Sequence, residues 1–144
     1  MYVLDTNIYL RAFRNADDAE ALAMHYARHL SRTVFSAVVA HELATGANDR
    51  RKSSELREKI IAPFAARGRI SIPTFASWLH AGEICGAMLR ERTYRGKAAQ
   101  KGFFNDVLLA VSCRAEGHVL LTWNIADFAI IRKFVRFEYA APWA

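Results

Sequence analysis

The stretch that decides the fold is MYVLDTNIYLRAF, residues 1–13. Residues 2–4 are a short apolar run typical of a buried strand, and the apolar side chains of residues 8–13 recur with the spacing of a helix. Asp5 stands between the two patterns, at the point where the strand ends. An aspartate in this position often caps the following helix. If other carboxylates lie close to it in the folded protein, Asp5 is instead a candidate site residue. The rest of the sequence must therefore be searched for such acids.

Short apolar runs alternate with helical patterns along the whole chain, which predicts an α/β fold in a single domain of residues 1–144. Such a fold has a short, mostly parallel central sheet flanked by helices on both faces, and binds ligands at the carboxyl ends of its strands. We expect strands at residues 2–4, 33–35, 70–73, 119–122 and 135–137. We expect helices at residues 6–14, 17–30, 37–46, 49–68, 75–94 and 100–117, and a short one from about 125.

Composition narrows the class of protein. Hydrophobic residues make up 53% of 144, which excludes a disordered chain. The 20 Lys and Arg residues outnumber the 14 Asp and Glu residues, and the formal charge of +6 favours a polyanionic partner, nucleic acid before membrane. No apolar run is long enough for a membrane span, and neither an export signal nor a cysteine motif occurs. We therefore expect a soluble cytoplasmic protein.

Four stretches place acidic or amide side chains near the expected strand ends: LDTN, SAVVAHEL, FFNDVLLA and LLTWNIADF. Asp106 is the most informative, because its neighbours on the helix are apolar and its carboxylate should be partly buried. Each position also has a structural interpretation. Asp106 could pair with an arginine, Asp5 could cap a helix, Glu42 could be a boundary residue, and Asn124 could cap the last helix with help from Asp127.

A parallel sheet would bring these side chains to one edge, where ionised carboxylates repel one another. A hard divalent cation removes that conflict, and Mg²⁺ prefers oxygen ligands while keeping several of its waters. An acidic cleft on a basic protein suits hydrolysis of a phosphodiester, because the metal neutralises the acids and basic side chains hold the backbone.

In this order and at this chain length, LDTN, the Glu of SAVVAHEL, the Asp of NDVLLA and TWNIADF resemble PIN-domain ribonucleases, and among them the VapC-type toxins of toxin–antitoxin systems. The resemblance covers essentially the whole chain. It implies an endoribonuclease dependent on Mg²⁺ or Mn²⁺, and it matches Asp5, Glu42 and Asp106 to the family's three recurrent acids. Some members have Asp where Asn124 stands, so the fourth role falls to Asn124 or to Asp127.

The resemblance also implies partners. A cognate VapB-like antitoxin would neutralise the toxin, and a homodimer or a toxin–antitoxin hetero-oligomer would form, with no membrane involved. In the mechanism we expect, Asp5 and Asp106 hold the cation and Glu42 binds the metal or orients the water bound to it. Further side chains could orient the carboxylates by hydrogen bonds: Thr6, Asn7 and Thr122.

A basic stretch, LRERTYRGKAAQK, precedes the helix that carries Asp106 and could follow an RNA backbone, with Tyr94 stacking on a base. The alternative for this stretch is a solvated loop. Its candidate RNA-binding residues are Arg90, Arg92, Tyr94, Arg95, Lys97 and Lys101. A second hypothesis for the whole chain is a non-catalytic PIN-like module that binds RNA or protein, but such a module would be expected to have lost one of the acids.

Overall fold

The computed structural model describes residues 1–143 and is built around a five-stranded sheet whose strand pairs are all parallel. The strand order is β3-β2-β1-β4-β5. The chain leaves β1 towards β2 and β3, then returns to place β4 on the other side of β1, so the order reverses between β1 and β4. Ligands of open α/β sheets bind at such a switch point. The strands are β1 (Tyr2–Leu4), β2 (Thr33–Ser36), β3 (Ile70–Ser71), β4 (Val119–Leu121) and β5 (Glu138–Ala140).

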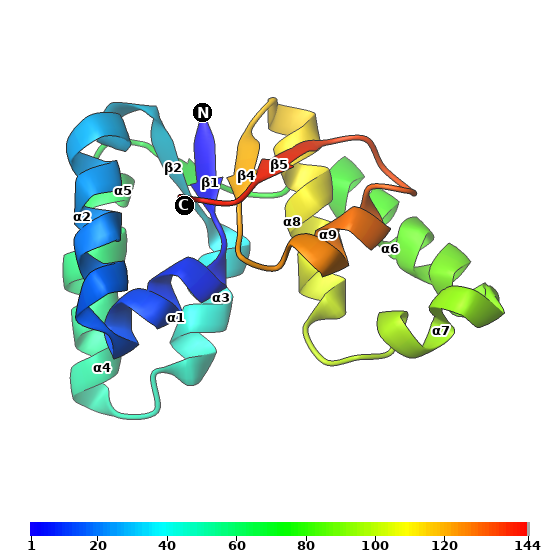
Figure 1. Ribbon diagram of the computed structural model, residues 1–144, viewed down its shortest axis with the longest axis horizontal. Helices are drawn as coiled ribbons and strands as arrows, with labels where there is room; N and C mark the ends of the chain where they lie inside the picture. The colour runs from blue at the N-terminus through cyan, green and yellow to red at the C-terminus, as the bar shows by residue number, and fades with distance from the viewer. Residues whose placement is uncertain (144) are drawn as a thin grey trace.

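Helices connect the strands and cover both sides of the sheet, as predicted for this α/β class. They are α1 (Thr6–Arg14), α2 (Ala16–His29), α3 (Ala37–Gly46), α4 (Arg50–Glu55), α5 (Ala62–Ala65), α6 (Phe75–Arg90), α7 (Arg92–Ala98), α8 (Phe103–Glu116) and α9 (Ile125–Ile131). Figure 1 shows α1 and α2 on one side of the sheet and α6, α8 and α9 on the other. None of the helices between residues 1 and 143 combines the length and apolar character that a bilayer crossing requires.

Local sequence signals set several helix boundaries. The Ser36 hydroxyl accepts a hydrogen bond of 3.1 Å from the amide of Val38, so the residue that ends β2 also caps α3. Gly117 closes α8 in the left-handed conformation, with φ of 70°. Both signals lie in the sequence at the positions where the structure uses them.

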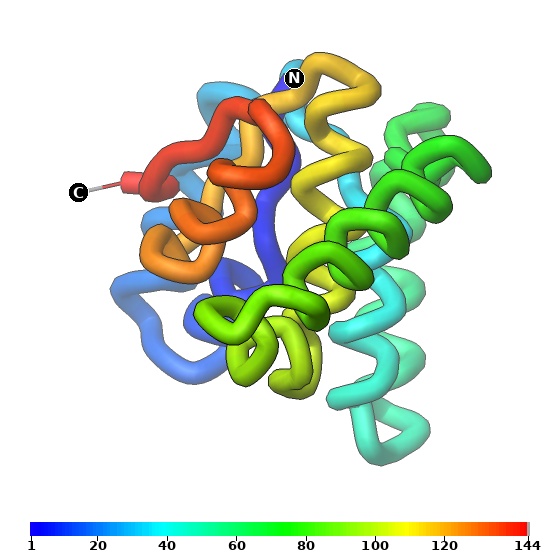
Figure 2. Tube along the Cα trace, turned by 90° about the vertical axis from the view of Figure 1, so that its right-hand side faces the viewer, coloured from blue at the N-terminus to red at the C-terminus, as the bar shows by residue number. Residues whose placement is uncertain are grey.

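The core is organised around α8, which lies beside β4 and packs along α6 (Figures 1 and 2). Its side chains over residues 107–113 are all buried, as the nearly all-round apolar pattern predicts. Phe35, next to the end of β2, and Phe128, on α9, are completely enclosed. This packing fixes the first turn of α8, and with it Asp106, at the carboxyl ends of β1 and β4.

The last strand differs from the prediction. The predicted strand at residues 135–137 is not paired, and the pairing with β4 falls instead on Glu138–Ala140. Val135 and Phe137 are nevertheless buried. The apolar pattern of residues 135–137 therefore reflects packing in the core. Hydrogen bonding to Val119–Leu121 determines which residues form the strand, and these are Glu138–Ala140.

The long helix predicted for residues 75–94 is broken. Helix α6 ends at Arg90, Glu91 takes an extended conformation with φ of −96° and ψ of 126°, and α7 begins at Arg92. The change of direction lets the Tyr94 ring pack edge-on against Phe134, with 5.1 Å between the ring centroids. The charged segment 49–68 is helical as expected but contains a wider π-helical turn, Leu56–Ile61, between α4 and α5.

Backbone conformation, and not lack of space, favours glycine at position 117. An added Cβ at Gly117 or at Gly82 meets no atom within 4 Å, but only Gly117 has a positive φ. We expect Gly117→Ala to lower the free energy of unfolding by roughly 1–2 kcal/mol, and Gly82→Ala in the interior of α6 to raise it by roughly 0.5–1 kcal/mol. Urea unfolding of both variants checks this, and equal effects of the two substitutions would contradict it.

Candidate active site

Asp5 lies at the switch point of the sheet and is almost fully enclosed, with 4% of its surface exposed. Its backbone amide donates to the carbonyl of Leu121 at 2.9 Å, which continues the β1–β4 ladder. Its Oδ1 accepts from the Thr6 amide at 2.8 Å, and its Oδ2 accepts from the Thr122 hydroxyl at 2.7 Å. Asp5 is therefore the cap of α1, and it is also joined to the strand that follows α8.

Thr122 and Asn7 link the two strand ends around this carboxylate. Thr122 is completely buried, and its hydroxyl oxygen accepts from the Asn7 amide at 3.3 Å and from the Asn124 backbone at 2.9 Å. The Asn7 amide also lies 3.3 Å from Asp5 Oδ2, while its oxygen accepts from the Trp123 backbone. The carboxylate of Asp5 is consequently fixed in orientation by side chains from both strand ends.

Glu42 reaches the same region from α3. Its Oε1 accepts a hydrogen bond of 2.8 Å from the Thr6 hydroxyl, and Thr6 is the residue whose amide binds Asp5. Glu42 is half-buried. Thr6 thus connects two carboxylates that are 37 positions apart in the sequence, and it leaves Glu42 Oε2 free of this contact.

Asp106 comes from the first turn of α8, directly after Gly102, which has φ of 87°. Burial, together with the charges of Asp5, Glu42 and Asp127, raises the pKa of Asp106 from 3.8 to about 8, and Lys97 acts in the opposite direction. Burial is also the main reason that the pKa of Asp5 rises to about 6, against the hydrogen bonds from Thr122 and Thr6. The acids predicted to converge are therefore close enough to oppose one another's ionisation.

Asn124 and Asp127, the two residues predicted as alternatives for the fourth acidic position, contact each other. The Asn124 amide donates to Asp127 Oδ2 at 3.1 Å and does not cap α9. The ammonium of Lys97 lies 2.8 Å from Asp127 Oδ1. Partial burial opposes ionisation of Asp127, but the hydrogen bonds from Lys97 and Asn124 and the charge of Lys97 outweigh it and lower the pKa of Asp127. Asp127 is thus the acid of this cluster that already has a cationic partner.

Some side chains of the predicted RNA-binding stretch pack against the protein, and others are exposed to solvent. Tyr94 packs on Phe134 and so does not present a free ring for a base, while Lys97 is turned towards Asp127. Arg95 donates from Nε to the carbonyl of Leu89 at 3.0 Å. Four members are exposed: Arg90, Arg92, Arg95 and Lys101. The stretch is a short helix between α6 and α8, and not a loop.

The sequence did not reveal two contacts at the edge of the site. One is the Lys97–Asp127 ion pair, which joins residues 30 positions apart. The other is the guanidinium of Arg11, which lies 4.3 Å from the centre of the Trp123 ring. Because Trp123 directly follows Thr122, the sequence could have placed the Trp123 ring near the site. No local pattern identifies Arg11 as the residue that stacks on it.

The donor chemistry fits a hard divalent cation. Asp5 and Asp106 would supply carboxylate oxygens. Burial, with a smaller effect of neighbouring acids, raises the pKa of both groups, and a bound cation would favour their ionised forms. Within residues 1–143, no group of three or more His, Cys, Asp or Glu side chains is arranged so that it could hold a metal ion. A hard divalent cation can be held by one or two carboxylates and complete its shell with water, which is what Asp5 and Asp106 would allow.

The fold and the site together define a parallel α/β protein with acidic side chains at the switch point of its sheet. Its family is shown by the profile of the PIN domain, which matches residues 2–133. The chain belongs to the PIN domain family, as the sequence resemblance predicted.

Solved structures share the same fold. A chain of DNA-bound VapBC from Salmonella typhimurium superposes with a TM-score of 0.71 at 19% identity, over 99% of this chain and 98% of that one. A chain of VapBC2 from Rickettsia felis, bound to a promoter DNA fragment, gives 0.65 at 23% identity over 99% and 98%. A chain of VapBC-1 from nontypeable Haemophilus influenzae gives 0.65 at 22% identity over 98% and 97%. No curated protein sequence matches the chain significantly.

The raised pKa of Asp106 makes a prediction about stability without metal. Between pH 3.8 and about 8 the folded protein holds a proton on Asp106 that the unfolded chain releases, so this residue lowers the free energy of unfolding as the pH rises. We expect Asp106→Asn to gain stability relative to the wild type between pH 5 and pH 8.5, measured by urea unfolding with a chelator. The exposed Asp17→Asn serves as control, and an Asp106→Asn difference that stays constant with pH would contradict the assignment.

Proposed function

We propose that the protein is a metal-dependent endoribonuclease, a VapC-like toxin that is neutralised by a cognate antitoxin. The observation that carries the proposal is the acidic environment at the switch point of the sheet. Thr6 joins Asp5 to Glu42, burial raises the pKa of Asp5 to about 6, and burial with the charges of Asp5 and Glu42 raises the pKa of Asp106 to about 8. A cluster of carboxylates that is costly to ionise is suited to binding a divalent cation. Membership of the PIN domain family supports the same activity.

The roles of the residues follow from their contacts. Asp5 and Asp106 would hold Mg²⁺ or Mn²⁺, which supplies positive charge and lowers the pKa of a coordinated water. Glu42 accepts the Thr6 hydroxyl on Oε1, which fixes its carboxylate while Oε2 remains available to accept a hydrogen bond from the attacking water. Thr122 and Asn7 keep the Asp5 carboxylate in place while charge changes around it.

RNA as the substrate is supported by charge. The chain carries a formal charge of +6, although its site is acidic, so the excess positive charge lies elsewhere on the surface. Arg90, Arg92 and Lys101 are exposed on the segment that leads to Asp106, where they can contact phosphates on either side of the cut bond. The buried free thiols of Cys85 and Cys113 suit a reducing cytoplasm, where such a nuclease would act.

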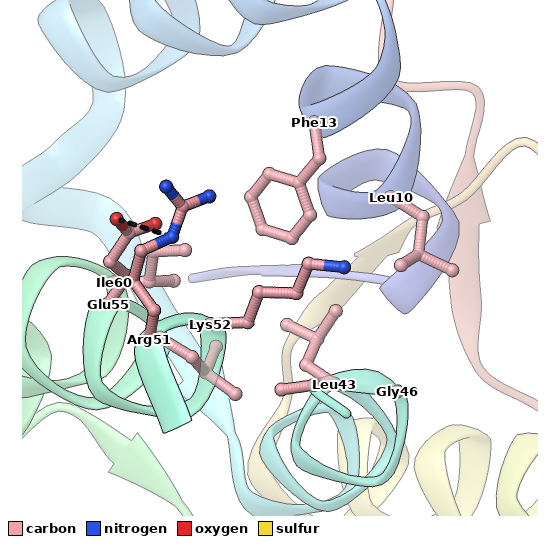
Figure 3. Close-up of a pocket in the computed structure, with 10 residues that line it drawn as sticks. Leu10, Phe13, Leu43, Gly46, Arg51, Lys52, Glu55 and Ile60 are labelled. Carbon is pink, nitrogen blue, oxygen red and sulfur yellow. Dashed lines mark ion pairs between the residues drawn. The ribbon is translucent and has the colours of Figure 1, made fainter. Parts of the chain in front are cut away.

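A groove at the C-terminal end of α3 offers a surface for the antitoxin (Figure 3). It has a volume of about 360 Å³, and α1, α3 and the α4 region line it. Figure 3 shows Phe13 and Lys52 directed across the opening, and Arg51 paired with Glu55 at its rim. Apolar walls with basic side chains at the edge suit an amphipathic peptide with acidic flanks. The solved VapBC complexes contain both a toxin and an antitoxin chain, which supports this kind of partner.

The homodimer that the resemblance implies finds a candidate surface on α6. Phe75, Trp78 and Leu79 are exposed at 82%, 49% and 54%, which is unusual for side chains of this size on one helix. Gly82 and Gly86 follow on the same face and would let another helix approach closely. We assign the contact between two copies to this face.

The central test of the proposed activity is Asp5→Asn. The amide keeps the shape of the side chain and can still accept from Thr122, but it removes the charge that holds the cation, so RNA cleavage should fall by at least roughly 100-fold while the fold persists. The measurement is sequencing of RNA ends after incubation with Mg²⁺ or Mn²⁺. Exposed Glu20→Gln is the matched control for loss of one acid.

Three results of this experiment have separate meanings. Cleavage that needs the divalent ion and disappears in Asp5→Asn supports the nuclease. Cleavage by Asp5→Asn at the wild-type rate removes the proposed site. RNA binding without any cleavage by the wild type favours the non-catalytic module.

The groove makes a second prediction. Phe13 is 56% exposed and forms one wall, so Phe13→Glu places a charge where the peptide's apolar anchor would sit and repels its acidic flank. We expect affinity for the antitoxin, sought in the reading frame next to the toxin's, to fall at least roughly tenfold. Met24→Glu, an equally exposed apolar site on α2, should bind normally. Equal loss in both variants would place the antitoxin elsewhere.

A further inference from the structure

Lys97 is the one residue of the basic stretch that is turned into the acidic site. Its ammonium lies 2.8 Å from Asp127 Oδ1, and its charge also reaches Asp106, where it opposes the effect of the surrounding acids. The two side chains of the pair are partly accessible, at 30% for Lys97 and 23% for Asp127. A ligand can therefore reach the ammonium of Lys97 from the solvent without unfolding any element.

The position of Lys97 is determined by α7. The helix is anchored by Tyr94, whose ring packs against Phe134, and Lys97 follows three residues later on the adjoining part of the helix surface. Neighbouring Arg95 is directed elsewhere, since its Nε binds the carbonyl of Leu89. Because the helix is broken at Glu91, α7 runs in a different direction from α6. This direction places Lys97 beside Asp127.

The charges of the site need a second cation. Asp5, Glu42, Asp106 and Asp127 carry four negative charges when ionised, and a single divalent ion neutralises half of them. An RNA phosphate adds a further negative charge in the same cleft and would be repelled. A lysine at the cleft mouth offsets part of this excess, and its flexible side chain can exchange one anionic oxygen for another.

We propose that Lys97 is a protein-borne cation that shares the acidic cleft with the metal ion and passes from Asp127 to a phosphate of the bound RNA. The RNA part of this inference rests on the proposed nuclease function. Asp127 then serves to hold the lysine in place before RNA arrives, and not primarily to bind metal. This also gives the Asn124 amide a purpose, because it fixes the other oxygen of Asp127.

The inference predicts effects of opposite sign from one substitution. Loss of the ammonium in Lys97→Met leaves the acids with one fewer counter-charge, so divalent ions should bind more tightly. The same loss removes a phosphate contact, so RNA should bind more weakly. A purely structural ion pair would weaken both kinds of binding when broken, or neither, and therefore gives a different pattern.

The first measurement is calorimetric titration of the metal-free protein with Mn²⁺, without RNA. We expect the Kd for Mn²⁺ to fall roughly three- to tenfold in Lys97→Met, the effect of one partly exposed charge, and to stay near the wild-type value in Lys97→Arg. Exposed Lys59→Met removes the same charge from a different part of the surface and should leave the Kd unchanged.

The second measurement uses RNA binding in place of cleavage. A fluorescein-labelled, mixed-sequence single-stranded RNA is titrated with Asp5→Asn and with Asp5→Asn combined with Lys97→Met, at several salt concentrations. Each phosphate contact of a single strand contributes roughly 0.7 to the slope of log affinity against log salt, so the double variant should lose about that much. The combination of Asp5→Asn with Lys59→Met should keep the slope of Asp5→Asn alone.

Tighter Mn²⁺ binding together with a smaller salt slope supports the role of Lys97. An unchanged or weaker affinity for Mn²⁺, or an unchanged slope, overturns it, even if the wild type cleaves RNA. If the protein binds no RNA, the proposed nuclease function and the RNA role of Lys97 both fail. The Mn²⁺ titration then still decides whether Lys97 is a cation of the cleft.

Discussion

Burial of the Asp5 carboxylate between two parallel strands is the constraint on which the rest of the site depends. A carboxylate that is removed from water must find donors or stay protonated. Asp5 finds three, the Thr122 hydroxyl from the far end of the chain, the Thr6 amide that opens α1, and the side-chain amide of Asn7. Because Thr6 also binds Glu42, a single buried acid ties together β1, β4 and α3. These hydrogen bonds hold the carboxylates of Asp5 and Glu42 in place at the switch point of the sheet.

This cluster of acids does not favour the stability of the fold. Asp5 and Asp106 are buried near two other acids, and the free energy needed to ionise Asp5 and Asp106 is reflected in their raised pKa values. Fold stability would be served better by apolar residues of similar size. Conflicts of this kind are typical of functional sites, where a ligand supplies what the protein lacks. The acidic cluster is suited to binding a cation. In the proposed site, the metal ion supplies most of the balancing positive charge and Lys97 supplies the rest.

Features that follow from local pattern were predictable from the sequence. Apolar periodicity and caps such as Ser36 placed most elements, and the rule for parallel sheets brought Asp5 and Asp106 to one edge. Features decided by packing between distant segments were not predictable. The break at Glu91 looks like continuous helix in sequence, since what redirects the chain is the packing of Tyr94 on a segment 40 residues later. The register of β5 and the partner of Lys97 depend on the same kind of contact.

The most direct test of the central claim is a measurement of the carboxyl pKa values themselves. ¹³C NMR titration of the aspartate side chains, with Asp106→Asn used for assignment, follows each group with and without Mg²⁺. The account predicts that Asp106 titrates near 8 and Asp5 near 6 in the metal-free protein, and that both values drop by several units when Mg²⁺ is present. Titration of both groups near 3.8, unmoved by Mg²⁺, would contradict it.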